Sequence, residues 1–479
     1  MIRQYVENQL LEQRSLLRGA TRDASGKPYF NRYMFYRLQK HLRNFLQRKT
    51  EPRWILIPGL RGVGKTTLLA QLFFDVNARI KEDHVLYVSL DDVVNKLGAD
   101  LYAILEAYEE ILSVSFTDLK EDVVLLVDEV HYDPKWQNAL KTLYDRSKRV
   151  LIVATGSSAI EIAINTDVAR RAYVEKLYPL KFTEYVMLAS RRDGNECLPS
   201  KGLGDLIKQA LFTTSSLRQT HELLKNKETA VRAYWQRVEK YSLIKYLKYY
   251  LLPSALLLDE EAQIYHMSNS VIDRIIERDI PQIKKFDGDT LRQIPKVLFA
   301  IASSDEISYE TISSLMQGMN VNTVVSVMDV LQKAELVLRI YPYGSVYSKV
   351  RKSSKYLFLA SSMRAALLSL LDARSVDTRY RGKLLEDLVG MYMHRELMGR
   401  NVTISYDPSA GGADFITDSP IGKRAWEVGW GKNDAAQVYA TMRERGIKEG
   451  ILITDAPLGL RTDDDAVLLT LPLHYFVLI

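Results

Sequence analysis

Apolar runs of strand length alternate with amphipathic stretches of helix length between residues 51 and 182. Uninterrupted apolar runs cover residues 54–57, 85–90, 123–127 and 150–154. A run that is apolar at consecutive positions is typical of a strand buried on both faces, and strands that alternate with helices form parallel sheets. The pattern therefore predicts an α/β fold with a parallel sheet that helices cover on both faces.

Changes in this pattern divide the chain into further regions, as expected for 479 residues, which exceed the size of one typical core. The expected regions are a polar helical segment at 1–50, the α/β core at 51–182, a helical lid or linker at 183–290, a region of short helices and strands at 291–356, and a second α/β region at 357–479.

The region 291–356 has the element order of a winged helix. Short helices are expected at 298–302, 309–317 and 322–333, the last capped by Asn322, and a strand follows at 336–340. In a winged helix the third helix can enter the major groove of DNA. A winged helix used only for packing is as well supported by the sequence as one that binds DNA.

The charges of this region bear on a DNA partner. The third helix has few cations, and its polar side chains are those of Asn322, Thr323 and Ser326. Cations on or beside the wing would contact phosphates, which position a protein without reading the bases. The cations expected there are Lys349, Arg351, Lys352 and Lys355.

A phosphate-binding motif, GxxxxGK[ST], lies between the run at 54–57 and the next helix. In such a loop, backbone N–H groups surround phosphate oxygens at a helix N-terminus, the lysine reaches the β and γ phosphates, and the hydroxyl suits Mg²⁺. Those two roles are expected for Lys65 and Thr66. The residues expected to bind the nucleotide are Gly59, Leu60, Arg61, Gly62, Val63, Gly64, Lys65, Thr66 and Thr67.

Two further strands end in side chains that suit the hydrolysis of a nucleotide. The run at 123–127 ends in Asp128, expected to hold Mg²⁺, and Glu129, expected to activate the attacking water. The run at 150–154 is followed by residues 155–158, where the hydroxyl of Thr155 is a candidate for sensing the γ-phosphate or positioning water. An ordinary turn explains residues 155–158 almost as well.

Composition limits the other classes of protein. Hydrophobic residues make up 47% and charged residues 26%, which is typical of a folded globular chain. The N-terminus mixes charges and no run of 18 apolar residues occurs, so we expect a cytoplasmic protein without a membrane partner. The single cysteine, Cys197, allows neither an internal disulfide nor a zinc site. A net charge of +6 permits an acidic partner such as DNA without demonstrating one.

The region 357–479 contains a carboxylate pattern. Asp414 and Glu427 are expected on neighbouring strands, with Glu386 on the preceding helix at 383–396. PD-(D/E)XK nucleases hold a metal ion with such carboxylates and need a lysine two residues after the second one. Gly429 occupies that position, so the nuclease interpretation is disfavoured unless Lys423 or Lys432 substitutes.

Taken together, residues 59–67, 128–131, 155–158, 169–171 and 179–185 resemble the prokaryotic AAA+ ATPases that carry a winged helix and a C-terminal domain similar to PD-(D/E)XK nucleases. The resemblance implies that Arg171, or its neighbour Arg170, senses or stabilises the γ-phosphate. Arginines of AAA+ proteins often act across a subunit boundary, so the resemblance is compatible with a homo-oligomer.

We therefore expect an ATP-binding and ATP-hydrolysing AAA+ switch that uses Mg²⁺ and acts on DNA. An alternative is a nucleotide-gated protein-binding or signalling adaptor with slow hydrolysis and an inactive nuclease-like domain. An ATP-regulated nuclease is the third and least favoured alternative.

Overall fold

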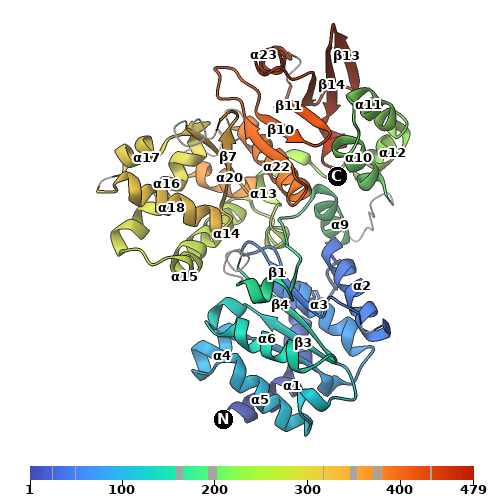
Figure 1. Cartoon of the computed structure of the whole chain (residues 1–479), viewed down its shortest axis with the longest axis vertical. Coiled ribbons are helices and arrows are strands. Elements are labelled where there is room, and N and C mark those ends of the chain that lie inside the picture. The colour runs from blue at the N-terminus through green and yellow to red at the C-terminus, as the bar shows by residue number, and fades with distance from the viewer. Residues whose placement is uncertain are drawn as a thin grey trace. The chain divides into compact units, whose positions relative to one another are not determined.

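The computed structural model describes the chain except for residues 24, 49, 158–164, 193–201, 317, 346–352, 371–375, 377–379 and 432–433. The chain forms two compact units (Figure 1). The first comprises Met1–Tyr178 and Lys333–Glu335, and the second comprises Pro179–Gln332 and Leu336–Ile479. Each unit has its own sheet, so each is described by itself.

The sheet of the first unit is fully parallel and has the strand order β2-β3-β4-β1-β5. Its strands are β1 (Trp54–Pro58), β2 (Val85–Ser89), β3 (Val123–Asp128), β4 (Val150–Gly156) and β5 (Tyr173–Val174). The predicted α/β class and parallel sheet are confirmed. Strand β5 was missed in the sequence because two residues do not form a recognisable apolar run.

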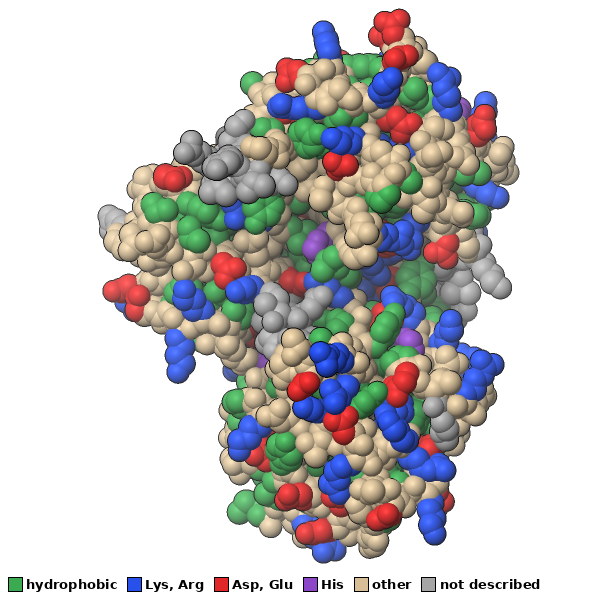
Figure 2. All heavy atoms as spheres, in the orientation of Figure 1, with side chains coloured by type: hydrophobic (Ala, Val, Ile, Leu, Met, Phe, Trp, Pro, Cys, Tyr) green, Lys and Arg blue, Asp and Glu red, His purple; other side chains and the backbone are tan. Residues whose placement is uncertain are grey.

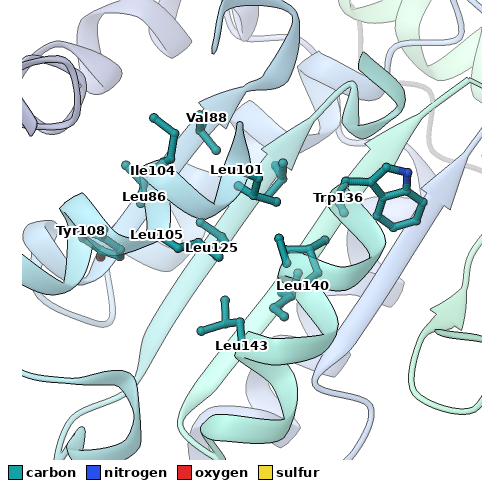
Figure 3. Packing of buried hydrophobic residues seen from close by; sticks show 14 of the residues in the cluster. Leu86, Val88, Leu101, Ile104, Leu105, Tyr108, Leu125, Trp136, Leu140 and Leu143 are labelled. Atoms are coloured by element: carbon teal, nitrogen blue, oxygen red, sulfur yellow. The ribbon is translucent and has the colours of Figure 1, made fainter. Parts of the chain in front are cut away.

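Helices surround this sheet because its strands are apolar on both faces. Alternate residues of β2 and β3, among them Leu86, Val88 and Leu125, share one core cluster with apolar side chains of α5 and α6 (Figure 3). The helices of the first unit are α1 (Ile2–Ala20), α2 (Tyr33–Arg48), α3 (Lys65–Asn77), α4 (Leu90–Leu97), α5 (Leu101–Leu112), α6 (Trp136–Arg146) and α8 (Thr166–Ala169).

Helix α1 covers the edge strand β2. The buried amide of Gln13 donates to the carbonyl of Val85 at 2.9 Å and accepts from the N–H of Tyr87 at 3.0 Å. One side chain thus satisfies two backbone groups that a neighbouring strand would otherwise pair. An unpaired edge would invite association with another chain, so α1 protects the sheet.

The second unit combines many helices with one mixed sheet. Its helices are α9 (Phe182–Arg192), α10 (Leu203–Phe212), α11 (Leu217–Lys225), α12 (Glu228–Val238), α13 (Leu243–Tyr249), α14 (Glu261–Arg274), α15 (Ile280–Ile283), α16 (Gly288–Ser303), α17 (Tyr309–Leu315), α18 (Val321–Lys333), α20 (Ser361–Ser369), α22 (Arg381–Leu397), α23 (Ala436–Arg445) and α24 (Leu473–Phe476).

This sheet has nine strands in the order β13-β14-β12-β11-β10-β9-β7-β8-β6. The regions 291–356 and 357–479 share it, because β7 pairs in parallel with β9, with Tyr341 opposite Ser405. The strands are β6 (Glu306–Ile307), β7 (Val337–Pro342), β8 (Ser354–Phe358), β9 (Thr403–Tyr406), β10 (Phe415–Ser419), β11 (Gly422–Val428), β12 (Glu449–Thr454), β13 (Gly459–Asp463) and β14 (Ala466–Pro472).

The three helices expected between 291 and 333 correspond to α16, α17 and α18. The expected cap of the third helix was wrong by two residues. The side chain of Asn320, and not that of Asn322, accepts the N–H of Thr323 at 2.9 Å and so satisfies a free donor at the helix start.

A buried ion pair connects the helices of the second unit to its sheet. Arg364 on α20 donates to Asp387 on α22 at 2.7 and 2.9 Å, and to the carbonyls of Ala302 at 2.8 Å and Tyr356 at 3.0 Å. Burial raises the pKa of Asp387, and Arg364 opposes that shift. Because the guanidinium contacts groups from α16, α20, α22 and β8, it holds these elements in one arrangement.

Candidate nucleotide-binding site

The motif loop connects β1 to α3, which begins at Lys65 (Figure 1). Gly62 and Gly64 have φ values of 85° and 93°, a left-handed conformation that favours glycine. A Cβ at Gly59 would lie 2.5 Å from the carbonyl oxygen of Leu177. These glycines allow a tight loop, and in phosphate-binding motifs the N–H groups of such a loop surround the phosphate oxygens.

The side chain of Lys65 remains at the loop. Its Nζ donates to the carbonyl of Gly59 at 3.0 Å and to that of Leu60 at 3.4 Å. The lysine is buried, whereas the neighbouring Thr66 is exposed. A cation is therefore held beside the loop.

Asp128 at the end of β3 lies at the centre of a hydroxyl cluster. Thr66 donates to its Oδ2 at 2.6 Å and Tyr87 donates to the same oxygen at 3.2 Å. Thr155 at the end of β4 donates to its Oδ1. Burial raises the pKa of Asp128, the charge of Glu129 adds to this effect, and the two threonine hydroxyls oppose it.

The structure thus brings together Thr66, Asp128 and Thr155 from three separate segments of the chain. Thr155 is buried, and its hydroxyl contacts Asp128 and the N–H of Glu129. Tyr87 was missed in the sequence, because a tyrosine within the apolar run at 85–90 looks like a core residue. It lies in the middle of β2, opposite Leu126 of β3, and no local signal in the sequence identified it.

Glu129 follows β3 in a left-handed backbone conformation with φ 55°. Its N–H donates to Oγ1 of Thr155 at 3.2 Å. Its Oε2 lies 3.2 Å from Nε2 of His131, and the side chain of Glu129 is 24% exposed. The carboxylate therefore retains access to solvent while neighbouring groups hold its backbone.

Arg171 lies away from these groups. Its guanidinium binds both oxygens of Asp145 on α6, at 2.8 and 3.0 Å, and donates to the carbonyl of Asp167 at 2.9 Å. Arg170 is exposed. A contact of either arginine with a γ-phosphate therefore stays a prediction.

The carboxylates predicted in the second unit do lie near one another, with a lysine that the sequence analysis placed elsewhere. Nζ of Lys355 lies 2.6 Å from Oε2 of Glu386 and 2.8 Å from Oδ1 of Asp414. Residues Phe415 and Trp426 are paired on β10 and β11, which places Asp414 near Glu427. Burial raises the pKa of Glu386 to about 7, and the charge of Asp414 adds to that shift while Lys355 opposes it.

The expectation that Lys355 contacts phosphates beside a wing was wrong. Lys355 lies on β8 and is 6% exposed, and its ammonium contacts the carboxylates of Glu386 and Asp414. Lys423 does not replace the missing lysine at Gly429, because its Nζ contacts Tyr343 at 2.9 Å and Asp418 at 3.6 Å. Among the residues singled out in the sequence analysis, those that lie outside the described part of the chain are Ser158, Cys197, Lys349, Arg351, Lys352 and Lys432.

Two absences within the described residues limit other kinds of site. Outside the gaps named above, no three His, Cys, Asp or Glu side chains are grouped so that they could hold a metal ion. A magnesium site built from one hydroxyl, one carboxylate and phosphate oxygens needs no such group. Within the same part of the chain, every helix is too short or too polar to span a membrane.

Comparisons with known proteins fit this geometry. A family described as "AAA domain" matches residues 51–186, and a family described as "Domain of unknown function (DUF8612)" matches residues 238–374. The uncharacterized protein MJ1637 of Methanocaldococcus jannaschii is 36% identical over 405 residues, which are 84% of this chain and 80% of that protein.

Solved structures with a similar chain path have low identity. The Aeropyrum pernix ORC1 protein in complex with DNA has 13% identity and a TM-score of 0.33, over 71% of this chain and 94% of that one. The AMPPCP-bound DnaA from Aquifex aeolicus has 16% identity and a TM-score of 0.27, over 64% and 90%. From its similarity in sequence, the chain belongs to the same family as MJ1637, and its residues 51–186 form an AAA domain.

Proposed function

We propose that this protein is a Mg²⁺-dependent ATPase whose site consists of the loop at 59–67 and the ends of β3 and β4. The observation that carries the proposal is the hydrogen bond of 2.6 Å between Thr66 and Asp128. It places the two oxygens expected to hold Mg²⁺ next to each other, at the loop expected to bind phosphates. The residues present therefore fit the metal ion that this chemistry requires.

The chain's own groups have separate roles in the proposed reaction. Backbone N–H groups of the loop bind the phosphates, and Lys65 neutralises charge on the β and γ phosphates. Glu129 accepts a proton from the water that attacks the γ-phosphorus, while the bond from that phosphorus to the bridging oxygen breaks and ADP leaves. When bound, Mg²⁺ supplies additional positive charge for the phosphate oxygens.

The experiment is a measurement of phosphate release from ATP with Mg²⁺ and with excess EDTA. We expect turnover only with the metal ion. Equal phosphate release from Lys65→Ala protein would show that the activity does not come from this site. Single-stranded, duplex and branched DNA added to the same assay test whether DNA stimulates turnover.

For the second unit we propose a winged helix, supported by α16, α17 and α18 and by the antiparallel order β6-β8-β7. Winged helices bind DNA in many proteins, so DNA is one partner to test. Three of the four cations expected to contact it, Lys349, Arg351 and Lys352, lie outside the described residues. The face of the first unit in Figure 2 has Lys and Arg interspersed with Asp and Glu, which does not favour a nucleic acid there.

One observation favours the alternative in which the proposed winged helix binds a protein, as in an adaptor. Exposed positions on α17 and α18 include Leu315, Val321 and Val325, with exposed fractions of 60%, 37% and 39%. Ser326, expected to read bases, accepts from Lys284 at 2.8 Å. Exposed apolar side chains fit a protein surface better than they fit phosphates.

Salt dependence distinguishes the two partners. If the cations beside the wing contact phosphates, log K should fall with log salt by roughly 0.9 per contact, and replacement of Lys349, Arg351 and Lys352 by alanine should reduce that slope by roughly two to three. If no salt-sensitive DNA binding occurs in any nucleotide state, the adaptor is the better proposal.

Two finer proposals concern oligomers and nuclease activity. We propose that Arg170, rather than the Asp145-bound Arg171, reaches the nucleotide of a neighbouring subunit if the protein forms a homo-oligomer. We also propose that the carboxylate cluster, which consists of Glu386, Asp414 and Glu427, is inactive as a nuclease. The ammonium of Lys355 contacts carboxylate oxygens of Glu386 and Asp414 that a metal ion would need.

A further inference from the structure

His131 lies beside the proposed catalytic base and has no role in the reaction described above. It follows β3 by three residues, and its side chain is 6% exposed. Its ring centroid lies 4.7 Å from that of Tyr132. The ring is therefore confined by packing, unlike a surface histidine that samples several rotamers.

The hydrogen bonding of the ring determines which nitrogen carries the proton. The backbone N–H of Ser157, directly after β4, donates to Nδ1 of His131 at 3.2 Å. A nitrogen that accepts a hydrogen bond has no proton of its own, so the neutral ring carries its proton on Nε2. Nε2 lies 3.2 Å from Oε2 of Glu129, a close polar contact whose geometry is not that of a hydrogen bond.

Glu129 needs a contact at its carboxylate because the hydrogen bond that holds this residue involves its backbone N–H. Its N–H is held by Thr155, but the glutamate side chain has several rotatable bonds beyond that point. A general base works only when its oxygen is within hydrogen-bond reach of the water that loses a proton. The imidazole supplies a polar contact at the far end of the side chain.

We propose that His131 is a positioning residue for Glu129 and that it transmits the position of Ser157, at the end of β4, to the catalytic carboxylate. The inference rests on the proposed ATPase function and concerns the control of the same site. It implies that a shift of the Ser157 N–H relative to the ring changes the orientation of Glu129 without any change in the phosphate-binding loop.

The test compares variants at His131 in the full-length protein. His131→Leu has a similar bulk without a donor, and His131→Gln keeps a side-chain N–H. We expect kcat for ATP to fall about tenfold to a hundredfold in His131→Leu, as for loss of positioning of a base, with ATP affinity changed less than about threefold. His131→Gln should recover at least part of kcat.

Two controls separate positioning from a general structural effect. His84 contacts the carbonyl of Asp122 at 3.2 Å at the amino-terminal ends of β2 and β3, so His84→Leu removes a partly buried histidine of the same unit and should leave kcat unchanged. Addition of His131→Leu to Glu129→Gln should cause almost no further loss, because residues that act through one another are not additive.

The outcomes distinguish this inference from the proposed function. If wild-type protein lacks Mg²⁺-dependent turnover, the ATPase proposal fails and this inference fails with it. If wild-type protein turns over ATP but His131→Leu keeps kcat within twofold, or if its loss is fully additive with that of Glu129→Gln, the inference alone is overturned. An ATP-induced rise in Tm of His131→Leu equal to that of the wild type would show that the variant is folded and binds nucleotide.

Discussion

Thr66 and Asp128 are separated by 62 positions in the sequence, and their side chains share a hydrogen bond of 2.6 Å. Thr66 is in the first turn of α3, and Asp128 is the last residue of β3. Parallel β1 and β3 both pair with β4, so their carboxyl ends lie at one edge of the sheet. That edge is where ligands bind in open α/β sheets, which places the proposed chemistry in a physically favoured position.

Lys65→Ala should abolish measurable ATP binding, because the ammonium is the only side-chain cation of the motif expected to contact the β and γ phosphates. For the wild type, ATP with Mg²⁺ at a hundredfold excess over Kd should stabilise the fold by about 2.7 kcal/mol. Thermal unfolding with and without ATP measures both effects. Lys96→Ala, on the surface of α4, is the matched control and should retain the full shift. A wild-type Tm that ATP does not change would contradict the site.

Glu129→Gln should bind ATP but lose turnover by about two orders of magnitude, because the amide keeps the size of the side chain but cannot accept a proton. Phosphate release and a separate binding measurement give the two quantities. Glu110→Gln removes an exposed carboxylate of the same unit and should leave both unchanged. Normal turnover in Glu129→Gln protein would exclude Glu129 as the base.

The carboxylate cluster of the second unit should not cut DNA. With Mg²⁺ or Mn²⁺, supercoiled and linear DNA should remain intact, because the buried Lys355 neutralises Glu386 and Asp414. Gel electrophoresis of plasmid DNA measures this directly. Asp414→Ala should leave ATP hydrolysis as it is in the wild type. Metal-dependent nicking that disappears in Glu427→Ala protein would instead establish the nuclease alternative.

Acid should destabilise the second unit through Glu396 on α22. Burial raises the pKa of this carboxyl, but Lys181 at 2.7 Å and Lys208 at 2.9 Å outweigh burial and lower its pKa to about 2. Because the folded pKa is below the ordinary value of 4.5, the contribution to stability is present above pH 4.5 and is lost as the pH falls toward 2. Its size is about 3 kcal/mol at most.

Urea unfolding at pH 5 and pH 3 measures this contribution. In Glu396→Gln protein the free energy of unfolding should differ less between pH 5 and pH 3 than it does in the wild type. Glu228→Gln, in an exposed pair on α12, should show the same difference in free energy as the wild type. The two ends of the buried pair respond differently, since burial and then Arg395 lower the pKa of Lys181 to about 8. An unchanged pH dependence in Glu396→Gln would show that Glu396 is not the source of the acid sensitivity, because Lys181 stays protonated throughout this pH range.

The sequence was sufficient for features that are local. The motif at 59–66 and the apolar runs identify the loop, four of the strands of the first sheet and the α/β class, because each depends on neighbouring residues. Residues whose importance arises from tertiary contacts were not recognised. Lys355 is 31 residues from Glu386 and 59 from Asp414, and no local pattern links these three.

Tyr87 and His131 illustrate the same limit within the nucleotide site. The first is part of an apolar run and the second follows Asp128 and Glu129, so their side-chain partners depend on the strand order β2-β3-β4. That order could not be read from the spacing of the strands. For Arg171 the resemblance to a family predicts a role at the γ-phosphate, which stays a prediction, and the structure adds that this arginine binds Asp145.

The pairing of β7 with β9 determines where this chain can be divided into fragments. A protein that begins at residue 357 would lack β7 and β8, so one side of β9 would present unpaired backbone groups, a common cause of aggregation. It would also lack Lys355, leaving Glu386 and Asp414 buried without their ammonium partner. Expression of residues 357–479 by themselves is therefore expected to give insoluble protein, and a fragment that begins at residue 179 preserves the whole sheet.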